Sequence, residues 1–146
     1  PVTGVISTDE ISRSEPWAKP SGASSSYGGN PLAATAALAT LETILDEKLV
    51  ERSATVGEEM KRKLRALQEK YEFIGDVRGV GLMIGVELAT PELAGAVAQL
   101  CFKRGLLLLE CGKKSIRFSP PLIITEAQAN VAADVFAAAC HDTRHE

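Results

Sequence analysis

The stretch FIGDVRGVGLMIGVEL, residues 73–88, marks a change in the character of the chain. It contains four glycines and then a largely apolar run, and this pattern predicts a turn that leads into a buried strand. Gly79, Gly81 and Gly85 match a dinucleotide-binding fingerprint only loosely, because such glycines should follow a strand and open a helix. Here the glycines open a strand, so a tight turn with a close strand crossing is the favoured interpretation.

Two short strands and a helix are expected directly after residue 88. The helix ends at Gly105 and carries apolar residues on one face, namely Leu93, Val97, Leu100 and Cys101. The segments LLLLE (106–110) and IRFS (116–119) predict strands joined by a turn, and Pro120 and Pro121 end the second strand.

Thr125 and Gln128 form a capping-box pattern that opens the last helix. This helix is expected to bury three apolar side chains, Val131, Val135 and Phe136. From residue 73 onward the order is therefore strand, helix, strand, strand, helix. That order predicts a small α/β domain whose helices lie on one face of a partly antiparallel sheet.

Upstream of residue 73 the sequence predicts two further helices. Apolar residues at steps of three and four indicate a surface helix with one buried stripe, formed by Val56, Met60, Leu64, Leu67 and Tyr71. Before it, Asn30 suits the N-cap of a helix and Pro31 suits its first position. One face of that earlier helix carries Leu38, Leu41 and Leu45.

The segment SSSYGGNP, residues 24–31, begins within a loop predicted for residues 14–27 and leads into the helix that starts at Pro31. Further upstream, Ser7 and Glu10 form a capping-box pattern for a short helix. Glycines let backbone N–H groups approach a ligand, hydroxyls donate to phosphate oxygens, and the following helix presents its positive end. A capped turn, a linker and an anion site all stay open on these residues. The lysine of a Walker loop is missing, which argues against nucleoside triphosphate binding.

Arg117 lies between apolar neighbours in the segment SIRFSPPL, and strand alternation places it on the same face as Ser115 and Ser119. An arginine in that position needs an anionic partner, because an unpaired buried charge is costly. Its planar guanidinium suits bidentate binding of a carboxylate. An internal ion pair with Glu87 or Glu110 is the alternative, and on these residues alone it is favoured.

The composition excludes several classes of protein. The 146 residues suit one domain, or one domain and a piece of another, and the net charge of −3 argues against nucleic-acid and membrane-surface binding. The apolar runs are too short or too interrupted to span a bilayer, and no secretory signal is visible. Cys101, Cys111 and Cys140 suit reduced thiols in a cytoplasmic protein. His141 and His145 lie in a polar tail, so neither a metal site nor a Ser-His-Asp set is expected.

Four blocks in this order resemble the C-terminal portion of class III pyridoxal-phosphate-dependent aminotransferases: SSSYGGNPLAATAALATLETI, IGDVRGVGLMIGVEL, KRGLLLL and IRFSPPLIIT. The match covers nearly the whole chain. It implies the fold type I of pyridoxal-phosphate-dependent transferases. Residues 1–45 would be the end of the large cofactor-binding domain with a dimer-interface loop, and residues 46–146 the small C-terminal α/β domain.

The resemblance also implies a function. Such an enzyme moves an amino group from an amino acid or ω-amine to a keto acid, with pyridoxal 5'-phosphate as cofactor, in a cytoplasmic homodimer with shared active sites. Ser26 matches the hydroxyl residue that contacts the cofactor phosphate of the other subunit, and Ser25, Tyr27 and Gly28 belong to the same cofactor site. Arg117 matches a strand arginine that binds the substrate carboxylate.

One departure from the family concerns the lysine that forms the Schiff base with the cofactor. In the family it lies just upstream of a segment that resembles PVTGV, residues 1–5, and no lysine of this chain occupies a matching position. The chain is therefore expected to be a fragment that is inactive by itself. Two alternatives stay open: an aminomutase or decarboxylase of the same fold, and a non-catalytic interaction domain.

Overall fold

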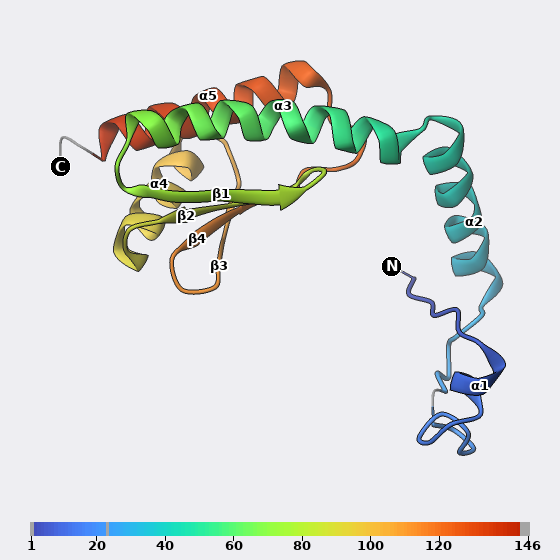
Figure 1. Cartoon of the computed structure of the whole chain (residues 1–146). Coiled ribbons are helices and arrows are strands. Elements are labelled where there is room, and N and C mark those ends of the chain that lie inside the picture. The colour runs from blue at the N-terminus through green and yellow to red at the C-terminus, as the bar shows by residue number, and fades with distance from the viewer. Residues whose placement is uncertain (1, 23, 144–146) are drawn as a thin grey trace. The chain divides into compact units, whose positions relative to one another are not determined.

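The computed structural model describes residues 2–22 and 24–143, and the chain divides into two units, Pro1–Glu47 and Lys48–Glu146 (Figure 1). This division falls two residues after the boundary predicted between residues 45 and 46. The assignment of the first unit to a large cofactor-binding domain stays a prediction. No helix in the described ranges has the length and apolar content needed to cross a membrane.

The second unit is built from a four-stranded sheet and three long helices. In chain order the elements are α3 (Leu49–Lys70), β1 (Ile74–Val80), β2 (Met83–Leu88), α4 (Pro91–Lys103), β3 (Leu109–Cys111), β4 (Ser115–Phe118) and α5 (Glu126–Asp142). The strand order is β1-β2-β4-β3, and all three pairs are antiparallel. The helix α4 joins β2 to β3, which run in the same direction, but β4 lies between them. The sheet predicted as partly antiparallel therefore has no parallel neighbours among the described residues.

Residues 73–88 form a hairpin, where the sequence predicted a turn and a single strand. Gly79 and Gly81 have positive φ angles of +151° and +54°, and the turn of the hairpin follows at Gly81 and Leu82. Gly75 falls at an irregularity between Ile74 and Asp76, where β1 loses its simple two-residue alternation. The predicted tight turn is confirmed.

The turn of this hairpin lies directly on α3. A Cβ atom added to Gly57 would overlap the backbone carbonyl of Gly81, so the two backbones meet where no side chain intervenes. The hydroxyl of Ser53 accepts a hydrogen bond from the N–H of Leu82 at 3.2 Å. The buried ammonium of Lys61 donates to the carbonyl oxygen of Gly79 at 3.0 Å and also pairs with Glu58. These contacts fix α3 against the sheet.

The hydrophobic core lies between one face of the sheet and the helices α3, α4 and α5 (Figure 1). The strands contribute Ile84, Val86, Leu88, Ile116 and Phe118, which are at most 2% exposed. The ring of Phe118 meets Phe136 of α5 edge to face, with centroids 5.3 Å apart. The stripe predicted on α3 is confirmed, because Val56, Met60, Leu64 and Tyr71 are buried and Leu67 packs against them.

The capping box of α5 is confirmed, but its buried face differs from the prediction. The hydroxyl of Thr125 accepts from the N–H of Gln128, and the Gln128 side chain accepts from the N–H of Thr125. Val131 is 61% exposed, so its predicted burial is wrong, and Val135 is half-buried. Alanines at positions 129, 133 and 139 take the core face beside Phe136, because small side chains let α5 pack closely.

The two short strands differ in extent from the prediction. β3 covers only Leu109–Cys111, and residues 106–108 precede it without strand pairing. β4 begins at Ser115, one residue before the predicted start, and Pro120 and Pro121 follow it as expected. The helix α4 ends at Lys103, and Gly105 with φ +82° follows it, as the sequence predicted.

The first unit contains α1 (Asp9–Ser12), a series of turns, and α2 (Pro31–Asp46). The cap of α1 is Thr8, whose hydroxyl accepts from the N–H of Ile11, so the predicted cap at Ser7 is wrong by one residue. Asn30 caps α2 as predicted, because its side-chain oxygen accepts from the N–H of Ala33 at 2.9 Å.

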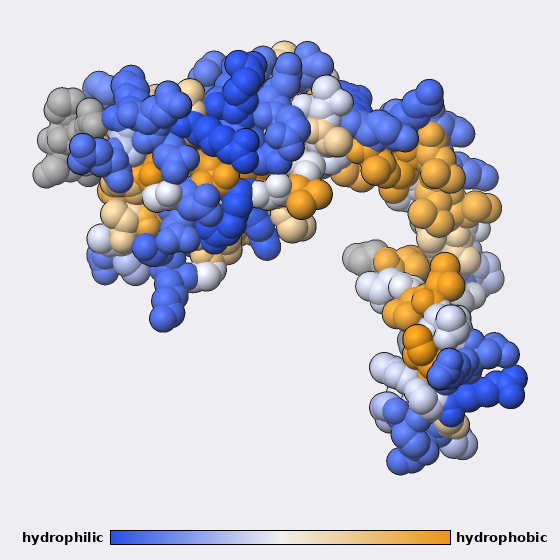
Figure 2. All heavy atoms as spheres, viewed as in Figure 1, coloured by the Kyte–Doolittle hydropathy of each residue, from blue (hydrophilic) through white to orange (hydrophobic). Residues whose placement is uncertain are grey.

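Leucines of α2 lie on the predicted face but are not covered within the described part of the chain. Leu38, Leu41 and Leu45 are 58%, 58% and 73% exposed, and α2 has no buried residue. Figure 2 shows apolar side chains gathered along this helix. The face is an unusually apolar surface for a helix exposed to water.

We expect Gly57→Ala to lower the free energy of unfolding of this chain by about 1–3 kcal/mol, because the added methyl group pushes α3 off the Gly81 carbonyl. Urea denaturation followed by circular dichroism measures this change. Gly95→Ala, inside α4, is the matched control: its Cβ atom would lie 3.6 Å from the Glu110 side chain, an ordinary contact. A Gly57→Ala variant as stable as the wild-type chain would contradict the proposed contact.

Candidate functional site

The sheet has a second face, opposite α3, α4 and α5, which we call the open face. The strand register places Arg78, Gly85, Arg117 and Leu109 side by side across it. The next row holds Asp76, Glu87, Ser115 and Cys111. All four strands contribute to both rows, so the open face brings together residues that are up to 41 positions apart in the sequence.

Arg117 occupies the middle of this face, and no described residue pairs with its charge. Its side chain is half-buried, and its Nε atom is buried with no hydrogen-bond partner. No carboxylate in residues 2–22 and 24–143 forms an ion pair with it. A buried donor without an acceptor is rare in folded proteins and calls for an explanation. Ser115 shares the face, as predicted, while Ser119 lies beyond the end of β4.

The internal ion pair predicted as the alternative for Arg117 is wrong for both candidate acids. Glu87 accepts from Lys114 at 3.1 Å through Oε1 and from Arg78 at 3.2 Å through Oε2. Glu110 pairs in register with Ile116, whose side chain belongs to the core, so Glu110 points to the opposite face from Arg117. The hydrogen bond from Lys114, and then the one from Arg78, lowers the pKa of Glu87.

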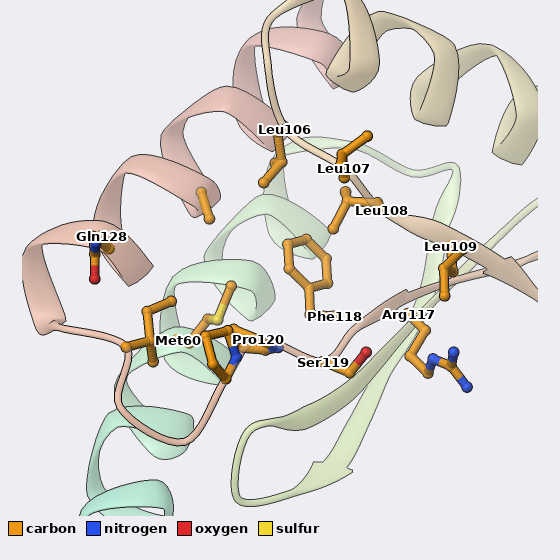
Figure 3. A pocket seen from close by; sticks show the side chains of 13 residues that line it. Met60, Leu106, Leu107, Leu108, Leu109, Arg117, Phe118, Ser119, Pro120 and Gln128 are labelled. Atoms are coloured by element: carbon orange, nitrogen blue, oxygen red, sulfur yellow. The ribbon is translucent and has the colours of Figure 1, made fainter. Parts of the chain in front are cut away.

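An apolar pocket of about 640 Å³ adjoins Arg117 (Figure 3). It is lined by Met60 of α3, by residues 106–109, by the end of β4 with the loop that follows it, and by Gln128 and Ala132 of α5. In Figure 3 the guanidinium of Arg117 points away from Phe118 and Leu106, so apolar and cationic surfaces lie side by side. The pocket was not predicted from the sequence, although the run of four leucines and the Pro-Pro pair that line it are visible there.

The loop between β4 and α5, which forms one wall of this pocket, is held in place by Arg52. The guanidinium of Arg52 donates to the carbonyl oxygen of Ile124 at 2.7 Å. The N–H of Ile124 in turn donates to the carbonyl oxygen of Pro121 at 3.0 Å. Because Arg52 lies at the start of α3, the contact joins segments 72 residues apart.

The second candidate region is the turn that precedes α2. The N–H of Gly28 donates to the carbonyl oxygen of Ser25, and the Asn30 side chain donates to the carbonyl oxygen of Tyr27. The hydroxyls of Ser25 and Ser26 are exposed and form no hydrogen bond with any described residue. The structure therefore brings Ser25, Ser26, Tyr27 and Gly28 together in one turn of the first unit, whereas Arg117 belongs to the second.

Two of the cysteines, Cys101 and Cys140, are buried thiols of low reactivity. Cys101, Cys111 and Cys140 are free, and burial raises the pKa of Cys101 to about 11 and that of Cys140 to about 12. Such thiols are poor nucleophiles, because the thiolate is the reactive form. The described part of the chain holds no cluster of three or more potential metal ligands. His145 lies outside the described residues.

We expect Lys114→Met to raise the pKa of Glu87, and to raise it more than Arg78→Met does, because the hydrogen bond from Lys114 makes the largest contribution to the lowered pKa. Carbon-detected NMR of the Glu87 carboxyl group during an acid titration measures the midpoint. Lys113→Met is the control, since Lys113 lies in the same turn and has no ion pair with the described residues. Equal midpoints in the Lys113 and Lys114 variants would contradict the contact.

Comparisons of the sequence and of the structure with known proteins both find aminotransferases. A family model described as Aminotransferase class-III matches residues 1–140. The 5-aminovalerate aminotransferase of Pseudomonas aeruginosa is 40% identical over 138 residues, which cover 88% of this chain and 32% of that protein. An alanine/serine racemase of Pyrococcus horikoshii is 40% identical over 122 residues, which cover 78% of this chain and 26% of that protein.

Among solved structures, the acetylornithine aminotransferase of Elizabethkingia anophelis has a TM-score of 0.79 and 34% sequence identity. The match covers 85% of this chain and 32% of that chain. The chain therefore spans about a third or less of the length of the relatives it matches.

Proposed function

Because the chain belongs to the class-III aminotransferase family, we propose that it forms the C-terminal portion of an aminotransferase that uses pyridoxal 5'-phosphate. The complete enzyme moves an amino group from an amino acid or ω-amine to a keto acid. The observation that carries the proposal is the buried Nε atom of Arg117, which has no acceptor among the described residues and belongs to a side chain beside an apolar pocket. Family membership supports a transaminase, and the geometry supports a role of this arginine in substrate binding.

Arg117 binds a carboxylate of the amino donor or keto acid. Its Nε atom is buried and has no acceptor, so a bound carboxylate satisfies a donor that the described residues leave open. Two parallel hydrogen bonds from one guanidinium fix both the position and the orientation of a carboxylate. The adjoining pocket offers an apolar surface next to the side chain of Arg117, whose guanidinium points away from Phe118 and Leu106.

The turn at residues 25–28 fits the phosphate of the cofactor. The hydroxyls of Ser25 and Ser26 have no hydrogen-bond partner among the described residues, and the turn lies next to the N-terminus of a 16-residue helix, whose positive end attracts anions. We assign the phosphate contact to Ser26, and Ser25, Tyr27 and Gly28 complete the same site. A Cβ atom on Gly28 would lie 3.3 Å from Cβ of Ser25, so glycine keeps this turn tight. When bound, the cofactor accepts the amino group and withdraws electrons from the substrate carbon that carries it.

The cofactor site is proposed to be shared between two subunits, with Ser26 serving the partner's cofactor. The apolar face of α2 that carries Leu38, Leu41 and Leu45 supports this homodimer, because a second subunit would cover it.

The lysine that binds the cofactor covalently is proposed to lie outside residues 1–146. The chain by itself is therefore expected to have no transaminase activity. The three free cysteines favour a cytoplasmic enzyme.

A second candidate function is a different reaction on the same scaffold, such as isomerisation or decarboxylation. The similarity to an alanine/serine racemase supports it, because that protein is as similar to this chain as the 5-aminovalerate aminotransferase is. An assay with and without a keto acid separates the two reactions. Only transamination requires the keto acid for repeated turnover.

We expect Arg117→Lys, made in the full-length enzyme, to lower kcat/KM for 4-aminobutyrate by roughly tenfold or more, because lysine cannot form the bidentate contact. The value for 1-aminobutane, which has the same chain length and no carboxylate, should stay within about twofold. Steady-state kinetics with both amines measures the difference. Arg65→Lys, on the exposed face of α3, is the control. Equal losses for both amines would rule out the carboxylate role.

We expect Ser26→Ala to weaken the binding of pyridoxal 5'-phosphate to the full-length enzyme by roughly tenfold, because a hydrogen bond to a charged group is lost. Equilibrium dialysis of the cofactor measures this without relying on activity. Ser24→Ala is the matched control, since the Ser24 hydroxyl already donates to the carbonyl oxygen of Ser21. Unchanged affinity in the Ser26 variant would count against the phosphate contact.

A further inference from the structure

Glu87 lies close enough to Arg117 to compete with any carboxylate ligand. Gly85 pairs with Arg117 across the β2–β4 ladder, and Glu87 pairs with Ser115, two positions along on the same open face. Diagonal neighbours of this kind are about 7–8 Å apart in an antiparallel sheet, a distance that two long side chains can bridge. Glutamate and arginine are both long enough, so the register alone permits a Glu87–Arg117 ion pair.

This pair does not form, because both oxygens of Glu87 bind other cations. Oε1 lies 3.1 Å from Nζ of Lys114, and Oε2 lies 3.2 Å from Nη1 of Arg78. Arg78 is itself oriented by Asp76, whose Oδ2 lies 2.8 Å from the same nitrogen. The two cations approach Glu87 from different parts of the sheet. Arg78 belongs to β1, and Lys114 belongs to the turn before β4.

The remaining acids of the sheet do not take the place of Glu87. Glu110 lies on the core side beside Gly95 of α4, and Asp76 is one strand further from Arg117 than Glu87 is. Glu87 is therefore the acidic residue of the described strands that is best placed to reach Arg117. Whether Arg117 is available to a ligand depends on what Glu87 binds.

We propose that Arg78 and Lys114 are positioning residues that hold Glu87 away from Arg117 and so keep the guanidinium available for a carboxylate ligand. The proposal rests on the proposed function, in which Arg117 binds the substrate carboxylate. Without the two cations, Glu87 pairs with Arg117 in a fraction of the molecules. The apparent affinity for an external carboxylate then falls in proportion to the fraction of Arg117 that stays free.

The test uses the chain itself and follows the Nε–Hε resonance of Arg117 in ¹⁵N–¹H NMR spectra, assigned by its loss in Arg117→Lys. Butyrate is the carboxylate probe and butyramide its uncharged control. In the wild-type chain, butyrate shifts the Arg117 resonance saturably and butyramide does not. In the double variant Arg78→Met with Lys114→Met, the resonance moves before any butyrate is added. The Kd for butyrate rises by about two- to fivefold, the range of a solvent-accessible ion pair.

The decisive step is to add Glu87→Gln to the double variant. Because glutamine carries no charge to offer Arg117, the resonance returns toward its wild-type position and the Kd recovers. A double variant with Arg65→Met and Lys113→Met removes the same number of positive charges elsewhere and should leave both readings unchanged. Thermal denaturation followed by circular dichroism verifies that each variant is folded.

Two results would overturn the inference. One is an unchanged Arg117 resonance in the Arg78/Lys114 double variant, which would show that Glu87 does not turn to Arg117. The other is a weakened butyrate affinity that Glu87→Gln fails to restore, which would point to a general loss of positive charge. An Arg117 resonance that does not shift when butyrate is added to the wild-type chain would instead contradict the proposed carboxylate role. The comparison of the Arg117 resonance between the wild-type chain and the Arg78/Lys114 double variant would still report whether Glu87 pairs with Arg117.

Discussion

The backbone contact between Gly57 and Gly81 is the constraint on which the arrangement of the second unit depends. Because neither residue has a side chain, α3 lies directly on the turn of the β1–β2 hairpin. Ser53 and Lys61 add hydrogen bonds to Leu82 and Gly79 on either side of this contact. With the hairpin held in this way, the alternating residues of β2 face the helices. The opposite face of the sheet, which carries Arg117, stays uncovered by the second unit's own helices.

Two cations of this unit, Lys61 and Arg117, differ in how far the described residues satisfy their polar atoms. Lys61 is buried, yet its ammonium reaches both Glu58 and the carbonyl oxygen of Gly79, so its polar atoms are satisfied within the fold. Arg117 is half-buried and keeps an Nε atom without an acceptor. Burial of an unpaired polar group costs free energy, and a bound carboxylate removes that cost. On the open face, the Nε atom of Arg117 is therefore the donor for which the described residues supply no acceptor.

Much of the local structure could be predicted from the sequence, because local interactions determine it. The caps at Asn30 and Thr125 depend on side chains that bond to backbone groups three residues away, and the prolines after β4 remove a donor from the strand. The hairpin was missed because β1 buries only Ile74 and Val77, which are three residues apart. The irregularity at Gly75 breaks the two-residue period that identifies a strand. Val131 was predicted to be buried because it is apolar. The face of α5 that packs against the core instead carries mainly alanines, which let the helix lie close to its neighbours.

The sequence by itself determined the order of the helices and of the last two strands, the family resemblance, and the choice of Arg117 and of the turn at residues 25–28 as candidate sites. It left open whether Arg117 pairs with Glu87, with Glu110 or with a ligand. Only the tertiary structure showed that neither of the two acids pairs with Arg117. The register of β2 against β4 and of β3 against β4 sets which acid shares a face with Arg117, and the packing of residues far apart in the chain sets that register. A one-residue change in either ladder would move a different side chain to the open face, and no local pattern in the sequence encodes that choice.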